Sequence, residues 1–301
     1  MQPYKKKPKL FSEQVEKLKE HGLNVPDSIH AEFYLSQINY YRFSAYCLPF
    51  EKDHASHQFK ENTYFDDILN LYVFDREFRL LLLDAIERIE VSLRTQMAYH
   101  LSHIHGTAHP HLKPELFLDN SKYNTSIAKL SYEVKSSREK FIEHLNDKYE
   151  ETLPPIWAVV EVMTMGQLSN WYSNIKTRSD RNKIASIYNV DEVILSSFGK
   201  HLSKVRNYCA HHARLWNRDF TFTIKIPKKG EEILVDSFYS ADRNSRKIYN
   251  SLVLIGYLMD IISPGNHWKK RLIELIDSHD VDVSQMGFPP NWKGQKIWVN
   301  Q

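Results

Sequence analysis

The chain has 301 residues, in which 40 lysines and arginines stand against 37 aspartates and glutamates, giving a formal net charge of +3. Hydrophobic residues make up 42% of the chain and charged residues 26%, values typical of a globular protein with a sizeable core. With only 9 glycines and 12 prolines, the composition excludes collagen-like repeats and argues against disorder and turn-rich all-β folds. The aromatic fraction of 13% fits a well-filled core or a surface that stacks on flat ligands.

Cysteine usage and apolar runs indicate the compartment. Cys47 and Cys209 lie far apart and match no disulfide framework, which indicates a reducing environment. The N-terminal run MQPYKKKPKLF is basic but lacks the apolar segment of a secretory signal. Apolar runs elsewhere are shorter than the roughly 18 residues of a membrane span. We therefore predict a cytoplasmic protein with no membrane segment.

The first hundred residues predict helices. A helix is expected over 13–21, with Ser12 as N-cap and Gly22 past its end, and Asp27 is expected to cap a second helix. Apolar residues at helical spacing then predict one long helix over 64–102, capped by Asp66 or Asp67.

The remaining chain alternates between helical patterns and one short period-two segment. Between residues 219 and 235, apolar and polar residues alternate around the sequence PKKG, which predicts a small β-hairpin insertion. No internal repeat or low-complexity linker marks a boundary. The prediction is therefore a mostly α protein forming one integrated unit over 1–301, with an N-terminal helical region (1–60), a core (61–265) and a C-terminal helix and tail (266–301). Further helices are expected over 123–149, from Pro154, and over 180–189, 191–213, 240–262 and 266–278.

The densest chemical signal is the segment VRNYCAHHARLWNR at 205–218. Asn207 and His211 lie four residues apart and so share a helix face, and the long side chain of Arg206 can reach the same patch. A guanidinium, an amide and an imidazole together could bind and cleave a phosphodiester. Arginine donates paired hydrogen bonds to phosphate oxygens, and histidine accepts and donates protons near neutral pH. The alternative is a polar helix end, where histidines cap carbonyls and Arg206 pairs with a core carboxylate. The residues alone do not separate these interpretations.

Two other clusters favour structural interpretations. The histidines at 103, 105, 109 and 111 are expected to form a solvated loop and not a zinc site, and Cys209 with His211 and His212 is disfavoured as a metal site for the same reason. Glu87, Glu90 and Arg94 have the spacing of an intrahelical ion-pair ladder, unless their face meets the Arg206 patch and supports it. Glycine-rich phosphate loops, nucleophile elbows and HExxH pairs are missing from the sequence, so neither metal nor cofactor is predicted.

Five segments together resemble the bacterial abortive-infection (Abi) proteins of the AbiD/AbiF type, in that family's order. They are INYYRFSAYCLPF (38–50), LYVFDREFRLLLLDAIERIEVSLR (71–94), PPIWAVVEVMTMGQLSNWY (154–172), VRNYCAHHARLWNR (205–218) and MGFPPNWKGQKIW (286–298). The resemblance implies a HEPN-type helical bundle, whose hallmark is arginine, a polar residue and, after four to six intervening residues, histidine. Arg206, Asn207 and His211 match that pattern. His212 fits the looser spacing, and we favour His211 because it shares a face with Asn207.

The resemblance also implies a function, a metal-independent endoribonuclease in antiphage defence or as a toxin. Arg206, Asn207, His211 and His212 are then the expected catalytic residues, and RNA is the expected substrate and, as a small structured RNA, the expected stable partner. The alternative is a non-catalytic module that only holds such an RNA. A homodimer is expected, with the 200–215 helices near its axis and Leu215 and Trp216 as apolar interface candidates, unless these two lie in the monomer core. The expected RNA-binding cations are Lys204, Arg214, Arg218, Lys5, Lys6 and Lys7.

Overall fold

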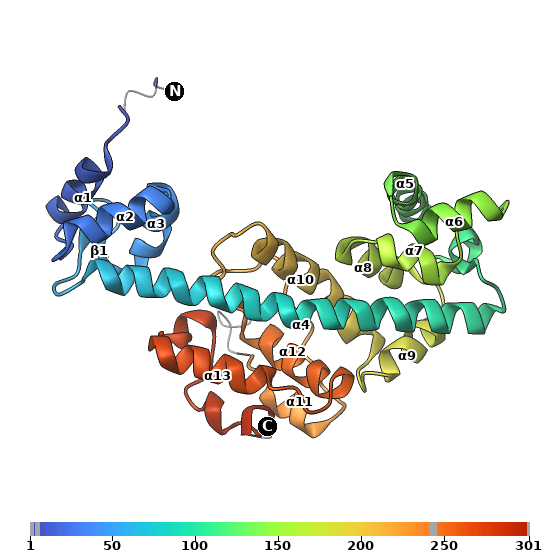
Figure 1. Ribbon diagram of the computed structural model, residues 1–301. Helices are drawn as coiled ribbons and strands as arrows, with labels where there is room; N and C mark the ends of the chain where they lie inside the picture. The colour runs from blue at the N-terminus through green and yellow to red at the C-terminus, as the bar shows by residue number, and fades with distance from the viewer. Residues whose placement is uncertain (1–2, 4–6, 241–245, 300–301) are drawn as a thin grey trace. The chain divides into compact units, whose positions relative to one another are not determined.

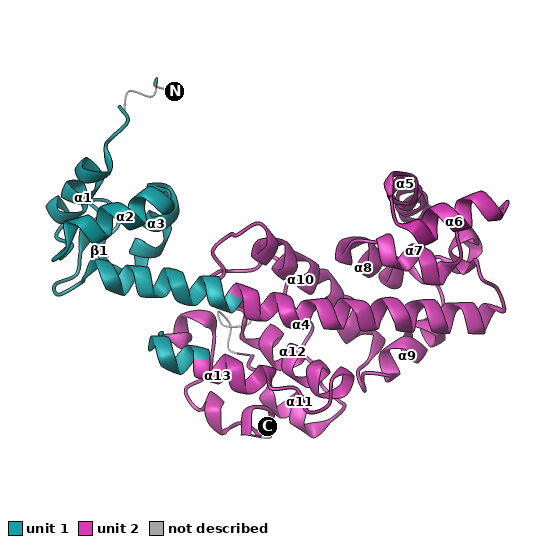
Figure 2. Ribbon diagram, in the orientation of Figure 1, with its two compact units in different colours: residues 1–78, 275–281 teal, residues 79–274, 282–301 magenta. Residues whose placement is uncertain are grey.

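The computed structural model describes residues 3, 7–240 and 246–299. Helices make up 67% of the structure, which confirms the predicted mostly α class. The chain divides into two compact units, residues 1–78 with 275–281 (unit 1) and residues 79–274 with 282–301 (unit 2), coloured separately in Figure 2. The single integrated unit, with divisions at residues 60 and 265, stays a prediction. No helix in the described ranges is long and apolar enough to cross a membrane.

Unit 1 contains three short helices, a small hairpin and the start of the long helix. Asp27 caps the second helix as predicted, because its Oδ1 accepts from the His30 N–H at 3.0 Å. The first helix, however, begins at Phe11, and the Glu13 carboxylate in place of Ser12 accepts from the N–H of residue 10 at 2.6 Å. The elements are α1 (Phe11–Glu20), α2 (Ser28–Gln37), α3 (Tyr40–Cys47), η1 (Leu48–Phe50), β1 (Glu51–Asp53) and β2 (Gln58–Phe59), with residues 65–78 of α4 (Phe65–His105).

The long helix α4 confirms the prediction for 64–102 to within three residues. Asp67 Oδ2 accepts from the Tyr64 N–H at 2.8 Å at its start, and Gly106 follows its end with a φ of +57°. In unit 1 the buried carboxylate of Asp75 on α4 accepts from the Tyr46 hydroxyl at 2.6 Å, which joins α3 to α4.

Unit 2 is built around the remainder of α4 together with α10, which buries one face, and α12, which is buried from Tyr249 to Met259; Figure 1 labels all three helices. Trp268 is buried and its indole N–H donates to the Leu81 carbonyl at 2.8 Å, which fixes the start of α13 against α4. The elements are η2 (Pro110–Leu112), η3 (Pro114–Leu116), α5 (Asn120–Ser136), α6 (Lys140–Lys148), α7 (Ile156–Val162), α8 (Met165–Asn174), α9 (Arg178–Ser186), α10 (Glu192–Ala210), α11 (Glu232–Ser237), α12 (Tyr249–Ile262), α13 (Trp268–His279, its last turn in unit 1), η5 (Val283–Met286), η6 (Trp292–Gly294) and α14 (Lys296–Val299).

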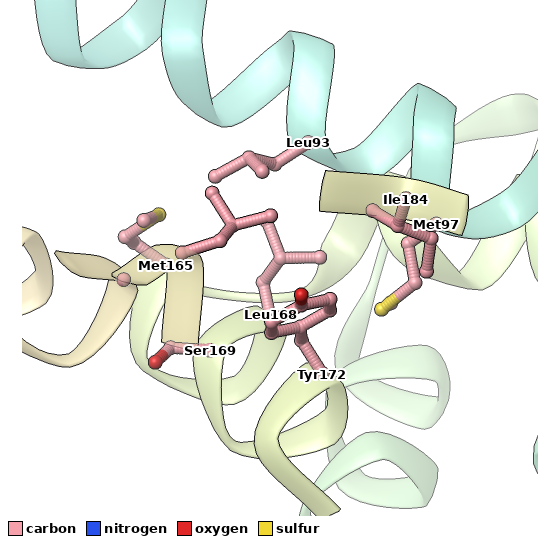
Figure 3. Close-up of a pocket in the computed structure, with 9 residues that line it drawn as sticks. Leu93, Met97, Met165, Leu168, Ser169, Tyr172 and Ile184 are labelled. Carbon is pink, nitrogen blue, oxygen red and sulfur yellow. The ribbon is translucent and has the colours of Figure 1, made fainter. Parts of the chain in front are cut away.

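Small residues let α8 and α10 pack closely. A Cβ added at Gly199 would lie 3.2 Å from Ser169 Oγ, and one added at Gly166 would lie 3.2 Å from Ser203 Oγ. Beside this contact is a cavity of about 20 Å³, lined mainly by apolar side chains such as Leu93 (Figure 3). It has room for about one water molecule, so it is a packing void and not a ligand site. The contact fixes the position of α10 in unit 2.

The predicted hairpin over 219–235 is wrong. Residues 219–231 form no strand, and residues 232–237 form helix α11. The period-two segment is irregular, and tertiary contacts take up its backbone groups: the Phe220 N–H donates to the Arg246 carbonyl at 2.9 Å and the Lys225 N–H to Ser197 Oγ at 3.0 Å. The hairpin that does form, β1 with β2, closes through Asp53, whose carboxylate accepts from the Ser56 N–H at 3.0 Å.

Candidate functional site

Helix α10 carries the motif at its C-terminal end. Asp191 caps its start, with Oδ1 accepting from the Val193 N–H at 2.8 Å. One face is buried, through residues such as Phe198, Leu202 and Val205, each 0% exposed. Lys200, Lys204, Arg206 and Asn207 lie on the exposed side. The amphipathic pattern thus anchors the helix by one face and presents the motif on the other.

The end of α10 is a Schellman motif with a histidine in the position that usually holds glycine. The Ala213 N–H donates to the Tyr208 carbonyl at 2.9 Å and the His212 N–H to the Cys209 carbonyl at 3.1 Å. His212 has a φ of +56°, in the left-handed region, where a side chain costs energy. The predicted helix over 191–213 therefore ends at Ala210, and His211 is its C-cap.

A substitution at His212 measures this backbone strain. We expect His212→Gly to have a free energy of unfolding about 1 kcal/mol higher than His212→Ala, because both lose the imidazole and only glycine adopts a positive φ freely. Urea denaturation of the two variants provides the measurement. The control is Ala213→Gly, where φ is not positive. At that position glycine should lower the stability of the protein. Equal free energies of unfolding for His212→Gly and His212→Ala would contradict the proposed backbone strain.

All four predicted catalytic residues are exposed at this helix end. Arg206 and Asn207 lie in the last turn of α10, His211 is the C-cap and His212 follows it. Arg206 forms no hydrogen bond or ion pair with any described residue, so in that part of the chain it does not pair with a core carboxylate. The His211 N–H donates to the Asn207 carbonyl at 2.9 Å, so the four-residue periodicity continues as far as His211 and ends at His212.

The predicted RNA-binding cations occupy different environments. Lys204 is exposed on α10 and has no ion-pair partner among the described residues. Arg218 is partly buried: its guanidinium lies 4.1 Å from the centre of the Tyr208 ring, and its Nε donates to the Arg214 carbonyl at 2.7 Å. Arg218 thus holds the segment after α10 against the helix. Lys7 is exposed in unit 1, while Lys5 and Lys6 lie outside the described residues.

Buried residues anchor the segment after α10. The sequence predicted two of them at a dimer interface and did not single out the third. Leu215 and Trp216 are 0% and 2% exposed, so they belong to the core of the chain and are wrong as dimer-interface candidates. His201 was missed: it is buried, its Nδ1 lies 2.7 Å from the Phe222 carbonyl oxygen and its Nε2 lies 2.6 Å from Ser251 Oγ on α12. The sequence contained one signal for its burial, because His201 lies on the same helical face as the apolar residues of α10. Burial lowers the pKa of His201. The neutral ring therefore connects α10 both to the segment at Phe222 and to α12.

Of the three proposed supporting residues on α4, only Glu90 and Arg94 form an ion pair of the predicted ladder. Arg94 pairs with Glu90 at 2.5 Å and also donates to the Met163 carbonyl at 2.7 Å and the Glu161 carbonyl at 3.0 Å. Arg94 therefore satisfies carbonyls at the C-terminal end of α7. Glu87 is exposed, and none of the three forms an ion pair with Arg206 in the described structure. A supporting role for Glu87, Glu90 and Arg94 toward Arg206 stays a prediction.

The histidines near the end of α4 are not a uniform solvated loop. His103 is exposed and its Nδ1 lies 2.7 Å from the Tyr99 carbonyl oxygen, whereas His105 lies 3.2 Å from Asp180 Oδ2. His111 is 1% exposed. No three His, Cys, Asp or Glu side chains gather as metal ligands within the described ranges. His111 is better understood as part of the core.

The buried imidazole of His111 predicts a loss of stability in acid. Burial, with a contribution from His109, lowers its pKa to about 4, below the value near 6.5 of an unfolded chain. The unfolded state therefore binds the extra proton first, so stability is complete above pH 6.5 and falls by about 3 kcal/mol as the pH drops to 4. Chemical denaturation of wild type and His111→Leu between pH 4 and 8 tests this. The leucine variant should lose a clear part of the slope, while His103→Leu, at an exposed histidine, should keep it.

Comparison with known protein families gives a match that covers most of the described helices. A family model described as Abi-like protein matches residues 33–217, more than half of the chain, from within α2 to just beyond α10. The matched range contains Arg206, Asn207, His211 and His212. Neither the curated proteins nor the solved structures contain a match to the chain.

Proposed function

Because the chain belongs to the Abi-like protein family, which associates it with abortive infection, we propose that it is a metal-independent endoribonuclease acting through the C-terminal end of α10. One observation carries the proposal: an exposed arginine without a described partner lies in the same helix end as an exposed amide and two exposed histidines. An arginine that is not paired with a carboxylate can use its whole guanidinium group to bind a phosphate. The HEPN-type pattern of Arg206, Asn207 and His211 supplies the expected roles.

RNA brings its own nucleophile, the 2′-hydroxyl, so the residues need only move protons and stabilise charge. His211 removes the proton from the 2′-oxygen or donates one to the leaving 5′-oxygen. Arg206 stabilises the charge that develops on the phosphoryl oxygens. Asn207 orients the imidazole or donates to a phosphate oxygen. The products are a 2′,3′-cyclic phosphate and a 5′-hydroxyl, and DNA is inert because it lacks the 2′-hydroxyl.

His211 is the better candidate for the acting histidine. Since helical periodicity continues to His211, this residue keeps the four-residue relation to Asn207, whereas the left-handed backbone of His212 breaks it. His212 then serves to end the helix. We also propose that Lys204, Arg214 and Arg218, with Lys5, Lys6 and Lys7, contact RNA phosphates, and that a small structured RNA is a stable partner.

The test is incubation of the protein with total RNA in excess chelator, comparing wild type with Arg206→Ala. Chelator-resistant cleavage by wild type only, with cyclic-phosphate ends, supports the proposal. Salt-sensitive RNA binding with no cleavage favours the alternative, a module that holds a structured RNA without cutting it. If the protein neither binds nor cleaves RNA, both functions are excluded.

We further propose a homodimer in which the ends of two α10 helices face each other, because in-line cleavage is served best by proton-transfer groups on both sides of the phosphorus. Since Leu215 and Trp216 are buried, the contact would use the polar surface around Arg206 and Asn207. Light scattering at low salt should give twice the chain mass of 35.6 kDa. A monomer that still cleaves RNA would contradict the dimer and leave the catalytic proposal intact.

A further inference from the structure

Unit 1 contains a cavity that none of the proposed catalytic residues lines, although Lys7, proposed above to contact RNA, is part of its wall. Its volume is about 860 Å³, within the range of small-molecule sites. Its walls are the residues before α1, one side of α1, residues along the length of α3 and the hairpin of β1 and β2. Every lining residue lies between positions 7 and 59, so the cavity belongs entirely to unit 1.

One part of the lining is cationic. Lys7, Lys9 and Lys17 all line the cavity, and none has an ion-pair partner among the described residues. The two carboxylates of the lining already have contacts: Glu13 accepts from the N–H of residue 10, and Glu51 lies 2.7 Å from His54 and 3.3 Å from His57. The lysines are therefore the groups left to attract an anion such as a phosphate.

Another part of the lining is aromatic. Tyr40 and Tyr41 at the start of α3 have ring centres 6.4 Å apart and nearly perpendicular planes, and the Tyr41 side chain is largely exposed. The Lys17 ammonium lies 5.3 Å from the centre of the Tyr40 ring. A cation thus stands next to a stacking surface. This is the pairing that a nucleotide needs, because its phosphate is linked to a planar base.

The lining also contains polar atoms without partners. Gln14 Oε1 and His21 Nδ1 are buried and have no hydrogen-bond partner in the described structure. A buried polar atom of this kind costs about 1–3 kcal/mol unless a ligand or water satisfies it. A nucleobase carries N–H donors and ring-nitrogen acceptors along its edge, so it can pair with both atoms. An apolar ligand would leave them unsatisfied.

We propose that this cavity of unit 1 binds a nucleotide, with the phosphate at Lys7, Lys9 and Lys17 and the base against Tyr40 and Tyr41. The nucleotide is either free in solution or one unstacked residue of a single-stranded RNA. The proposal does not rest on the ribonuclease function, because none of these residues belongs to α10.

The test is titration calorimetry on the full chain with guanosine 5′-monophosphate and, separately, with a 2′-O-methyl RNA hexamer that cannot form a cyclic phosphate. Lys17→Gln should weaken binding about tenfold, as should Tyr41→Ala, while Tyr41→Phe keeps the ring and the affinity. The matched control is Lys19→Gln on the same helix, because Lys19 pairs with Glu16 and does not line the cavity. Its affinity should stay within twofold of wild type.

Each result has a distinct meaning. Binding of the mononucleotide with this pattern identifies a free nucleotide site, and binding of the hexamer alone with the same pattern identifies an RNA site. Absence of binding by both probes at millimolar concentration, or equal losses in Lys17→Gln and Lys19→Gln, would overturn the proposal. Arg206→Ala should bind the mononucleotide like wild type, so failure of the ribonuclease proposal is recognised separately.

Discussion

Replacing His211 with alanine is expected to lower the rate of RNA cleavage by about 10³-fold, within the range that a general acid or base contributes. The residue is exposed at the C-cap of α10, where alanine leaves the buried face of the helix intact. Affinity for a 2′-O-methyl RNA should change little, since phosphate contacts elsewhere supply most of it. Single-turnover cleavage at saturating RNA, with a parallel binding assay, separates the two effects.

His212→Gly is the matched control for His211→Ala. It removes the neighbouring imidazole while suiting the positive φ of that position, so the helix end is preserved. We expect it to cleave RNA at a rate within a few-fold of wild type. A loss in His212→Gly with activity retained in His211→Ala would assign the chemistry to His212. Cleavage that survives loss of both imidazoles would contradict the proposed catalysis altogether.

The sequence predicted the helices best where an apolar stripe and an end signal agree. For α4, the periodic apolar residues and Gly106 placed the boundaries within three residues of Phe65 and His105. For the helix predicted over 123–149, the pattern was correct but the break was missed, because α5 ends at Ser136 and α6 begins at Lys140 with polar residues on both sides. Polar helix surfaces carry little information about where one helix stops and another starts.

The segment at 219–235 shows why local pattern misled. Alternation of apolar and polar residues favours an extended chain, and residues 219–226 are not helical. A strand also requires a partner strand, and here the partners are the Arg246 carbonyl, the Ser197 hydroxyl and the ring of His201, all distant in sequence. Contacts of that separation are invisible to a local pattern.

The candidate site was predictable in its composition but not in its detailed backbone. The spacing of Arg206, Asn207 and His211 follows from the sequence, as does their helical setting. The left-handed conformation of His212 does not, because glycine is the usual residue there and its absence suggested that the helix continues. Nor could the sequence decide between core and interface for Leu215 and Trp216, since both environments are apolar.

Helix α10 has a structural role along its buried face and a proposed functional role at its C-terminal end. Its buried face, with Phe198, Leu202 and the bridging His201, fixes the helix against α8 and α12. Its last turn contributes no described ion pair to that packing, so the residues there are available for chemistry. Substitutions of the exposed residues Arg206, Asn207 and His211 should therefore alter activity with little effect on the free energy of unfolding.

Arg206 provides the second test of this separation. Arg206→Ala should lower the cleavage rate at saturating RNA by about 10²–10³-fold, the loss measured when one preorganised group that stabilises transition-state charge is removed. RNA affinity should fall about tenfold, because one phosphate contact is also lost. Arg206→Lys should recover most of the affinity but little of the rate, since an ammonium keeps the charge without the forked geometry of a guanidinium.

The control for Arg206 is Lys200→Ala, which removes an exposed cation from the same helix about 9 Å along its axis. Because Lys200 lies outside the last turn, its loss should leave the cleavage rate at saturating RNA unchanged. Equal losses of rate in the two variants would mean that α10 acts only through its general positive charge, and the assigned role of Arg206 would be wrong. A large loss in Arg206→Ala with unchanged thermal stability would instead support a role of the guanidinium at the reacting phosphate, because Arg206 is exposed and forms no hydrogen bond or ion pair with a described residue that the substitution would break.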